Sequence, residues 1–330
     1  MDSKFEVVIA DGDFAPDEFE VLRKIGANVL KFQTHDPEQI LKITRTAHAI
    51  ICVYAPIDAR IINNLERARV IVVCGMGYDN VDVPAASEKG IVVCNVPDYM
   101  TFEVAEHTMA LILAMARRVT WGDRFARDGS WRKYGASTWR RLMPITHLDG
   151  KIIGIVGFGR IGRQVAERLQ AFQVGKILVY DPFVPSSICS RMGVELVDLP
   201  ELMNRSDIIS INALLTSQTH HLIGRDQLKL MKPTSFIVST SRGKIIDQAA
   251  LVEALQENKI AGASLDVLDK EPPNDDEPIL KCENVILTPH IAFASEKAVS
   301  NLRKFALEEV ARVLCGQPPR HPITQRPSGN

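Results

Sequence analysis

Three segments in the second half of the sequence carry polar side chains suited to acid–base and anion-binding chemistry. They are SRGKIID with Arg242, LDVLDKEPP with Glu271 and LTPHIAFAS with His290. An imidazole titrates near neutral pH and can exchange a proton with an alcohol, and a carboxylate beside it would orient the ring. A guanidinium can bind a carboxylate through two parallel hydrogen bonds. The three groups together suit hydride transfer at an alcohol carbon beside a carboxylate, without a metal.

Each of these side chains also has a structural interpretation. Arg242 could be a surface cation, Glu271 a loop carboxylate and His290 a hydrogen-bonded core histidine. The functional interpretation is favoured because all three follow predicted strands, at the end of an open sheet where ligands bind. The other histidines considered are predicted to be structural, one near a helix start and two in a polar turn: His107, His220 and His221.

A glycine-rich motif precedes these segments in the sequence KIIGIVGFGRIG, between a predicted buried strand and an amphipathic helix. Gly157 permits a tight turn, Gly159 lets the backbone approach a pyrophosphate, and Gly162 lets the helix and strand pack closely. The helix N-terminus offers N–H groups and a positive dipole end to phosphates. This context predicts a dinucleotide-binding site.

Asp181 ends the next predicted strand, ILVYD, nineteen residues after Gly162. A carboxylate at this position can accept hydrogen bonds from both hydroxyls of the adenosine ribose and would repel a 2′-phosphate. The alternative is that Asp181 only forms a turn before Pro182. The motif and the carboxylate together favour NAD over NADP as the cofactor.

The elements that must position these residues form two α/β arrays. Apolar runs alternate with amphipathic stretches at 16–25, 37–46 and 58–66 in the first hundred residues, and the alternation resumes after residue 150. Strands that alternate with helices predict parallel sheets covered on both faces. The predicted strands are 5–10, 27–32, 48–54, 70–74 and 91–94 in the first array, and 151–156, 176–180, 207–212, 235–240, 262–267 and 284–288 in the second.

A long apolar helix is predicted between the two arrays, over residues 101–119. Its middle is apolar all round, so we expect it to be buried on more than one side and to be a candidate subunit interface. Residues 120–149 are less regular and are predicted to form an extended arm or an interface segment. This stretch holds all three tryptophans: Trp121, Trp131 and Trp139.

Length and composition bound the class of protein. A chain of 330 residues favours two domains. Its net charge of −1 gives no indication of nucleic-acid or membrane-surface binding. Six cysteines without a C-x-x-C pair predict a reducing compartment, no disulfide framework and no metal site. No signal peptide is expected, and the longest apolar run of nine residues is too short to span a membrane. We therefore expect a cytoplasmic protein.

In several ordered motifs the sequence resembles the D-isomer-specific 2-hydroxyacid dehydrogenases, over nearly the whole chain. The motifs are VVCGMGYDNVDV (72–83), NVPDYMTFEVAEHTMALILAMAR (95–117), the Gly157 loop, SRGKIIDQAALVEAL (241–255), IAGASLDVLDKEPP (260–273) and TPHIAFAS (288–295). The resemblance implies an NAD-dependent oxidoreductase that transfers a hydride between the cofactor and a small D-2-hydroxy or 2-keto acid.

The resemblance also implies roles for individual residues. His290 would be the acid/base, Glu271 its partner, and Arg242 the residue that binds the substrate carboxylate and keto oxygen. Other substrate-binding residues would be Tyr54 and the backbone N–H groups of Gly75, Met76 and Gly77. Asp266 would bind the nicotinamide carboxamide. The implied cofactor site comprises Thr108, Gly157, Gly159, Arg160, Ile161, Gly162, Asp181, Thr240 and Asp266.

The family fold implied is α/β, with two doubly wound parallel-sheet domains and a cleft between them. Residues 1–100 and 294–330 would form a flavodoxin-like substrate domain, and residues 101–293 a Rossmann NAD domain. Most relatives are homodimers built through the long helix and the arm that follows it, so a homodimer is expected here.

Some positions depart from the family pattern. Asn212 and Leu214 replace a histidine and a proline common in a loop that lines the cofactor, so NAD affinity is the property affected. The segment VYAPI (53–57) has no arginine, which disfavours a phosphorylated substrate, although Arg60 on the following helix could partly compensate. Because Arg60 could compensate, D-3-phosphoglycerate dehydrogenase is kept as an alternative activity. Another alternative is an NAD-sensing scaffold like the C-terminal-binding proteins, a branch that carries an aromatic residue where this sequence has Phe293; the sequence gives no positive sign of that function.

Overall fold

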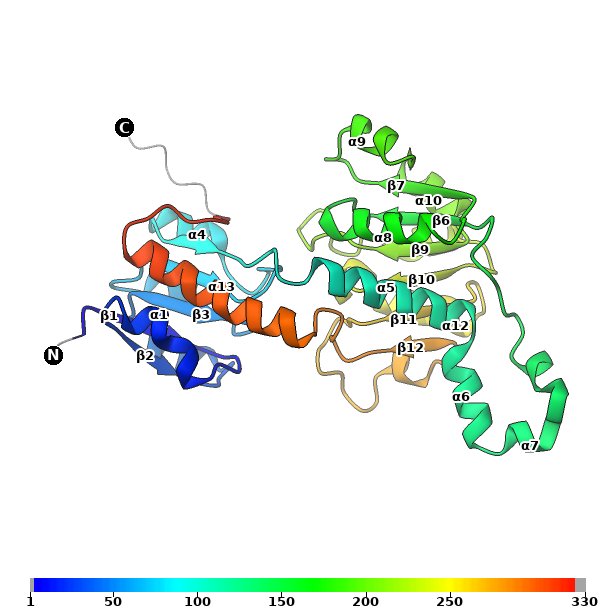
Figure 1. Cartoon of the computed structure of the whole chain (residues 1–330), viewed down its shortest axis with the longest axis horizontal. Coiled ribbons are helices and arrows are strands. Elements are labelled where there is room, and N and C mark those ends of the chain that lie inside the picture. Colours follow the sequence, from blue (N-terminus) through cyan, green and yellow to red (C-terminus); the bar gives the residue numbers. More distant parts are fainter. Residues whose placement is uncertain (1–2, 324–330) are drawn as a thin grey trace. The chain divides into compact units, whose positions relative to one another are not determined.

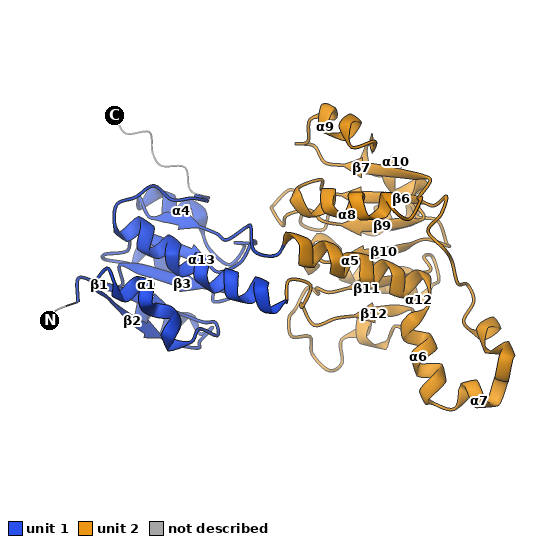
Figure 2. Ribbon diagram, viewed as in Figure 1, with its two compact units in different colours: residues 1–100, 295–330 blue, residues 101–294 orange. Residues whose placement is uncertain are grey.

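The computed structural model describes residues 3–323 and contains two compact units, shown in Figures 1 and 2. Unit 1 comprises the described residues of 1–100 and 295–330, and unit 2 is the continuous segment Thr101–Ala294. No helix within residues 3–323 is long and apolar enough to cross a lipid bilayer.

Unit 1 is built on a parallel sheet of five strands in the order β2-β1-β3-β4-β5. This is the flavodoxin-like strand order. The central strands β3 and β4 are buried at every position, as their unbroken apolar sequences predict. The strands are β1 (Phe5–Ile9), β2 (Ala27–Lys31), β3 (Ala49–Cys52), β4 (Val70–Val73) and β5 (Val92–Cys94).

Four helices of unit 1, α2, α3, α4 and α13, begin with a side-chain N-cap. Asp36, Asp58, Asp82 and Ser295 each accept a hydrogen bond from a backbone N–H in the first turn of the helix that follows. The last of these helices, α13, packs against α1, β3 and β4. The helices are η1 (Pro16–Phe19), α1 (Glu20–Arg23), α2 (Pro37–Thr44), α3 (Ala59–Asn63), α4 (Val83–Glu88) and α13 (Glu296–Leu314).

Unit 2 contains a parallel sheet of seven strands in the order β12-β11-β10-β9-β6-β7-β8. This is the Rossmann order extended by one strand at the β12 edge. Strand β8 was not predicted from the sequence, because its two residues form no apolar run. The strands are β6 (Ile152–Val156), β7 (Lys176–Tyr180), β8 (Glu195–Leu196), β9 (Ile208–Ile211), β10 (Phe236–Ser239), β11 (Gly262–Leu265) and β12 (Val285–Leu287). The predicted fold class, two parallel α/β domains, is confirmed.

The long helix of unit 2, α5 (Thr101–Ala116), packs against β10, β11 and helix α8 (Arg160–Gln170), as Figure 1 shows. Burial on more than one side is therefore confirmed. The helix ends earlier than predicted, because Arg118 takes a left-handed backbone conformation with φ of 55°. The other helices of the unit are α9 (Ser186–Arg191), α10 (Leu199–Arg205), α11 (Arg225–Leu230), η3 (Gly243–Ile245), α12 (Gln248–Gln256) and η4 (Pro278–Lys281).

The segment that sequence periodicity could not assign forms three short helices after α5. They are α6 (Val119–Arg127), α7 (Ser130–Tyr134) and η2 (Gly135–Arg141), and none of their residues is buried. Figure 1 shows α6 and α7 reaching away from the sheet of unit 2. We refer to residues 119–149 as the arm.

Candidate active site

The glycine loop joins β6 to α8, and its three glycines meet different surroundings. Gly157 has φ of 89°, and a Cβ there would lie 2.6 Å from the backbone of Ala213. A Cβ at Gly162 would lie 2.3 Å from the carbonyl oxygen of Gly157. A Cβ at Gly159 would meet no atom of the described structure within 4 Å. The fold itself thus requires glycine at the first and third positions, whereas the second leaves space for a ligand.

The first turn of α8 borders this space, and its backbone N–H groups have no acceptor within the helix itself. Gly159 is the N-cap residue, and its carbonyl oxygen accepts the hydrogen bond of Arg163 N–H at 3.2 Å. The N–H groups of Arg160 and Ile161 precede that bond and have no intrahelical acceptor. They can therefore donate to an anion at the positive end of the helix.

Asp181 follows β7 and lies against the glycine loop. Its Oδ2 accepts a hydrogen bond from Phe158 N–H at 2.7 Å, and its Oδ1 accepts one from Phe183 N–H at 2.9 Å. The bond from Phe183 N–H closes a turn around Pro182, as predicted by the alternative in which Asp181 is only a turn former. The first bond ties the carboxylate to the loop, and each oxygen keeps a lone pair with which it can accept a ribose hydroxyl.

His290 and Glu271 form a direct pair after β12 and β11. Nδ1 of His290 lies 2.5 Å from Oε2 of Glu271, and Oε1 of Glu271 accepts a hydrogen bond from Leu268 N–H at 2.8 Å. An ionised carboxylate only accepts, so Nδ1 carries the proton of this bond and Nε2 is the ring atom suited to exchange a proton with a substrate. His290 has φ of 52°, an uncommon conformation for a residue with a side chain.

The pKa of Glu271 lies below its ordinary value. Burial of the carboxyl would raise this pKa, but the hydrogen bond and charge of His290, the Leu268 N–H and the charge of Arg242 outweigh it. The carboxylate therefore stays ionised at neutral pH and can stabilise a protonated imidazole.

Arg242 lies after β10 and next to the Glu271 loop. Its Nη1 donates to the carbonyl oxygen of Ser241 at 3.0 Å. The following residue, Gly243, approaches the Glu271 loop so closely that a Cβ would lie 2.0 Å from the carbonyl carbon of Leu268. Three segments that are distant in sequence thus bring Arg242, Glu271 and His290 to the carboxyl end of one sheet, within unit 2.

Asp266 is buried, and its carboxylate holds the backbone on the far side of His290. Oδ1 accepts from Thr288 Oγ1 at 2.5 Å and from Ile291 N–H at 3.0 Å, and Oδ2 accepts from Ala292 N–H at 2.8 Å. The predicted contact with a nicotinamide carboxamide would use the remaining acceptor capacity of the carboxylate.

Two further cofactor candidates contact each other, Thr108 in the middle of α5 and Thr240 directly after β10. Thr108 Oγ1 lies 2.8 Å from Thr240 Oγ1 and 2.7 Å from the carbonyl oxygen of Val104, to which it donates. Since a hydroxyl has one proton, Thr240 is the donor of the pair. Thr108 is fully buried, so the more exposed Thr240 is the better placed of the two to meet a ligand.

His107, which was predicted to be structural, contacts the loop that carries His290. Its Nε2 lies 3.0 Å from Thr288 Oγ1 and 3.5 Å from Asp266 Oδ1. Helical periodicity could have indicated this contact, because His107 lies three residues after the buried Val104 and four before the buried Leu111, on one side of α5.

In unit 1, the predicted substrate-binding loop follows β4. The carbonyl oxygens of Gly75 and Met76 accept hydrogen bonds from Val96 N–H at 2.9 Å and Asn95 Nδ2 at 2.7 Å. Within residues 3–323, the N–H groups of the three loop residues Gly75, Met76 and Gly77 have no acceptor. The loop therefore presents donors without partners, as an anion site requires.

Asp11 is a residue of unit 1 that the sequence analysis missed. Its side chain, 2 % exposed, accepts hydrogen bonds from the N–H groups of Val53, Tyr54 and Ala55 at 2.7, 2.7 and 3.0 Å and lies 3.1 Å from His35 Nε2. The N–H of Tyr54 is thus engaged, whereas Tyr54 as a whole is 50 % exposed. A signal existed, because a carboxylate that directly follows an apolar strand is a common loop organiser.

The family assignment follows from sequence comparisons. Residues 109–292 match the model of the D-isomer-specific 2-hydroxyacid dehydrogenase NAD-binding domain. The chain is 41 % identical over 271 residues to a glyoxylate reductase of Korarchaeum cryptofilum, which covers 82 % of this chain and 80 % of the relative. This chain belongs to the D-isomer-specific 2-hydroxyacid dehydrogenase family. The predicted family and the predicted NAD cofactor are confirmed.

Other members of the family differ in their named substrates. A D-3-phosphoglycerate dehydrogenase of Archaeoglobus fulgidus is 36 % identical over 319 residues; the match covers 96 % of this chain and only 59 % of that longer protein. The structure of a D-lactate dehydrogenase from Aquifex aeolicus, complexed with NAD and lactic acid, superposes with a TM-score of 0.87 at 28 % identity, covering 98 % of this chain and 100 % of the other. The family therefore fixes the type of reaction but leaves the substrate open.

The residues of unit 2 fit the family's dinucleotide. The open position at Gly159 and the donors of α8 suit a pyrophosphate. Asn212, after β9, donates from Nδ2 to Ser210 Oγ at 2.9 Å, and its buried Oδ1 has no partner among the described residues. Asn212 and the neighbouring Ala213 lie against Gly157. A buried acceptor left without a donor beside the glycine loop is consistent with a bound group completing the site.

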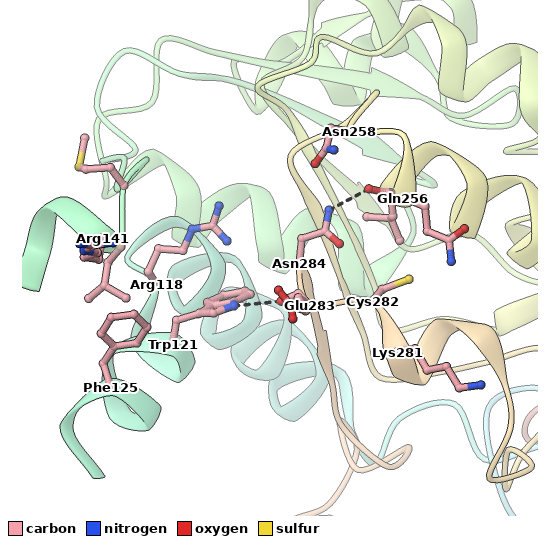
Figure 3. A pocket seen from close by; sticks show the side chains of 13 residues that line it. Arg118, Trp121, Phe125, Arg141, Gln256, Asn258, Lys281, Cys282, Glu283 and Asn284 are labelled. Atoms are coloured by element: carbon pink, nitrogen blue, oxygen red, sulfur yellow. Dashed lines mark hydrogen bonds between the residues drawn. The ribbon is translucent and has the colours of Figure 1, made fainter. Parts of the chain in front are cut away.

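A separate cavity of about 420 Å³ lies between the arm and the segment before β12, as Figure 3 shows. Trp121 donates from Nε1 to the carbonyl oxygen of Glu283 at 3.0 Å, and Arg118 lies over the Trp121 ring at 4.6 Å. Lys281 and Arg141 add further cations to the wall. None of the predicted site residues lines this cavity, so it is distinct from the dehydrogenase site.

Proposed function

We propose that this dehydrogenase reduces a small, unphosphorylated 2-keto acid to the D-2-hydroxy acid with NADH. Bound NADH supplies the hydride. The observation that carries the proposal is the 2.5 Å pair of His290 Nδ1 and Glu271 Oε2, in the same unit as the NAD-binding motif. In this proposal His290 donates a proton from Nε2 to the keto oxygen, and Glu271 stabilises the imidazolium beforehand. Arg242 binds the substrate carboxylate, as a planar fork can.

Unit 1 is proposed to be the substrate domain and unit 2 the NAD domain. The N–H groups of Gly75, Met76 and Gly77 would bind the substrate carboxylate, and Tyr54 would line that end. Thr240 and Asp266 would contact the nicotinamide end of the cofactor, and Arg160 and Ile161 the pyrophosphate. Support for these roles comes from the N–H groups of Gly75, Met76 and Gly77, which have no acceptor within residues 3–323, from the open position at Gly159 and from the exposed Tyr54 side chain.

The choice of an unphosphorylated substrate is supported by the surroundings of Arg60. Both terminal nitrogens of Arg60 contact the Glu38 carboxylate, at 2.5 and 2.9 Å. The only cation that the sequence suggested near the neutral VYAPI segment is therefore already paired. The observation that supports the competing activity, D-3-phosphoglycerate dehydrogenase, is the similarity to the Archaeoglobus fulgidus enzyme.

A substrate panel distinguishes these activities. Turnover with NADH would be measured for glyoxylate, hydroxypyruvate, pyruvate and phosphohydroxypyruvate, with the His290→Gln variant as the control for background oxidation. We expect an unphosphorylated acid to give the highest kcat/KM. A clear preference for phosphohydroxypyruvate would establish the alternative, and no turnover of any keto acid would favour a scaffold.

NAD specificity is tested by Asp181→Ala. The wild type is expected to prefer NADH, and loss of charged hydrogen bonds worth about 1.5–3 kcal/mol should raise the KM for NADH by roughly ten- to a hundredfold. The KM for NADPH should change less, because the repulsion of the 2′-phosphate disappears. Equal wild-type kcat/KM for both cofactors would contradict the assignment.

We further propose a cytoplasmic homodimer that associates through α5 and the arm. The arm leaves large apolar side chains exposed, among them Val119, Trp131, Trp139 and Met143. Large apolar side chains that are exposed together on one segment favour a partner that covers them. Light scattering should give about twice the mass of 36.6 kDa, and a monomer at micromolar concentration would refute the proposal.

A further inference from the structure

His107 reaches the His290 loop through one hydroxyl group. Nε2 of His107 lies 3.0 Å from Thr288 Oγ1, which in turn lies 2.5 Å from Asp266 Oδ1. The His107 side chain is 21 % exposed and the Asp266 side chain is fully buried. The chain of contacts therefore runs from a partly exposed ring on α5 to a buried carboxylate at the end of β11.

The direction of these hydrogen bonds follows from the number of protons. An ionised carboxylate is an acceptor only, so the single hydroxyl proton of Thr288 lies toward Asp266. Thr288 Oγ1 must then accept from His107, which places a proton on Nε2 of that ring. His107 is thus a donor at the start of a relay that ends on Asp266.

Asp266 fixes the backbone on both sides of His290. Its carbonyl oxygen accepts from His290 N–H at 2.9 Å, and its carboxylate accepts from the N–H groups of Ile291 and Ala292 at 3.0 and 2.8 Å. His290 itself has φ of 52°. A left-handed conformation at a residue with a side chain persists where surrounding contacts impose it. A misdirected Asp266 carboxylate would release this turn.

We propose that His107 is a positioning residue for the reaction, which holds the Thr288 hydroxyl on Asp266 and thereby keeps His290 in its left-handed turn against Glu271. The inference rests on the proposed function, in which His290 is the proton donor. It adds a second histidine to the site, which never touches the substrate.

Matched substitutions separate the donor role from simple space filling. Gln at position 107 keeps an N–H donor on a side chain of similar length, whereas Leu removes it. We expect His107→Leu to lower kcat about ten- to a hundredfold, as displacement of a reacting group does, with KM for the keto acid nearly unchanged. His107→Gln should keep most of the activity. Thr288→Ser and Thr288→Val form the same pair at the next position.

A double mutant tests whether the two positions act through one relay. His107→Leu combined with Thr288→Val should be no slower than the worse single variant, because residues in one network are not additive. Additive losses would overturn the proposal, as would equal losses in His107→Leu and His107→Gln. Should His107→Leu fail to fold, the Thr288 pair gives the same comparison.

A measurement independent of turnover keeps this inference apart from the proposed function. Hydrogen–deuterium exchange of residues 288–292 in the whole protein should be faster in His107→Leu than in the wild type, and unchanged in His107→Gln. Unchanged exchange in His107→Leu would refute the positioning role. If the wild type reduces no keto acid, the proposed function fails, while the exchange data still decide whether His107 holds the loop.

Discussion

The sheets of units 1 and 2 each have a point where the strand order reverses, and different residues lie there. A carboxylate lies at this point in unit 1 and a glycine loop in unit 2. In unit 1 this point lies between β1 and β3. The Asp11 carboxylate lies there and accepts hydrogen bonds from the backbone N–H groups of residues 53–55. In unit 2 it lies between β6 and β9, where a Cβ at Gly157 would meet the backbone of residues 212–213 and a Cβ at Gly159 would meet no atom within 4 Å.

The difference shows that the topology of a doubly wound sheet offers a crevice without deciding its use. A carboxylate saturates the donors of the crevice and turns it into a structural joint. Glycines leave the donors and the space to a ligand. In unit 1, the N–H groups of Gly75, Met76 and Gly77 have no acceptor within residues 3–323, and they lie one strand further along, after β4.

The largest effect is expected from His290→Gln, which tests whether the chemistry depends on unit 2. Loss of general acid–base help should lower kcat by at least about a hundredfold, within the usual range of 10² to 10⁴. NADH binding should change little, because the glycine loop and Asp181 are untouched. Stopped-flow turnover and NADH fluorescence titration would measure the two quantities. Near-wild-type turnover in a chemistry-limited assay would return His290 to a structural role.

Asp11→Ala tests the joint in unit 1. Three N–H groups would lose their acceptor, so the free energy of unfolding should fall by about 2–4 kcal/mol. His35→Gln is the matched control: the His35 side chain is 58 % exposed, and its replacement should cost no more than about 0.5 kcal/mol. Urea denaturation would give both values. If Asp11→Ala is as stable as the wild type, the carboxylate is not a joint and the comparison fails.

Two glycine substitutions sharpen the contrast inside unit 2. Gly162→Ala puts a Cβ against the Gly157 carbonyl and should destabilise the fold by about 1–3 kcal/mol. Gly159→Ala meets no protein atom within 4 Å, so stability should change by less than about 0.5 kcal/mol while NADH binding weakens. Thermal unfolding with and without NADH separates the two effects. Intact NADH affinity in Gly159→Ala would mean that no phosphate approaches this position.

The smallest effect concerns the pH dependence of stability. Because the folded-state pKa of Glu271 is lowered from 4.5, its ionised form stabilises the fold above pH about 4.5, and this contribution is lost as the pH falls through the folded-state pKa. The difference in unfolding free energy between wild type and Glu271→Gln should therefore be largest near neutral pH and shrink on acidification. Urea titrations at several pH values would measure it, and a constant difference would argue against an ionised Glu271.

Much of the fold and part of the site could be predicted from the sequence. Runs such as VIVVC and the glycine motif are local signals, because burial on both faces and close backbone approach each require particular residue types. The two-residue strand β8 and the arm helices carry no such pattern. Asp11 and His107 act on segments distant in the chain, and only the folded topology shows which donors and acceptors they meet.

Unit 1 is assembled from both ends of the described chain, whereas unit 2 is continuous. Helix α13 buries Leu302, Leu307 and Val310 and packs against β4, so the sheet of unit 1 lacks that cover until the ribosome has passed through all of unit 2. At about 5–20 residues per second, synthesis of residues 101–294 takes on the order of ten to forty seconds. During that interval the apolar face that α13 later covers is exposed to solvent, and exposed apolar surface of this kind favours aggregation of the nascent chain.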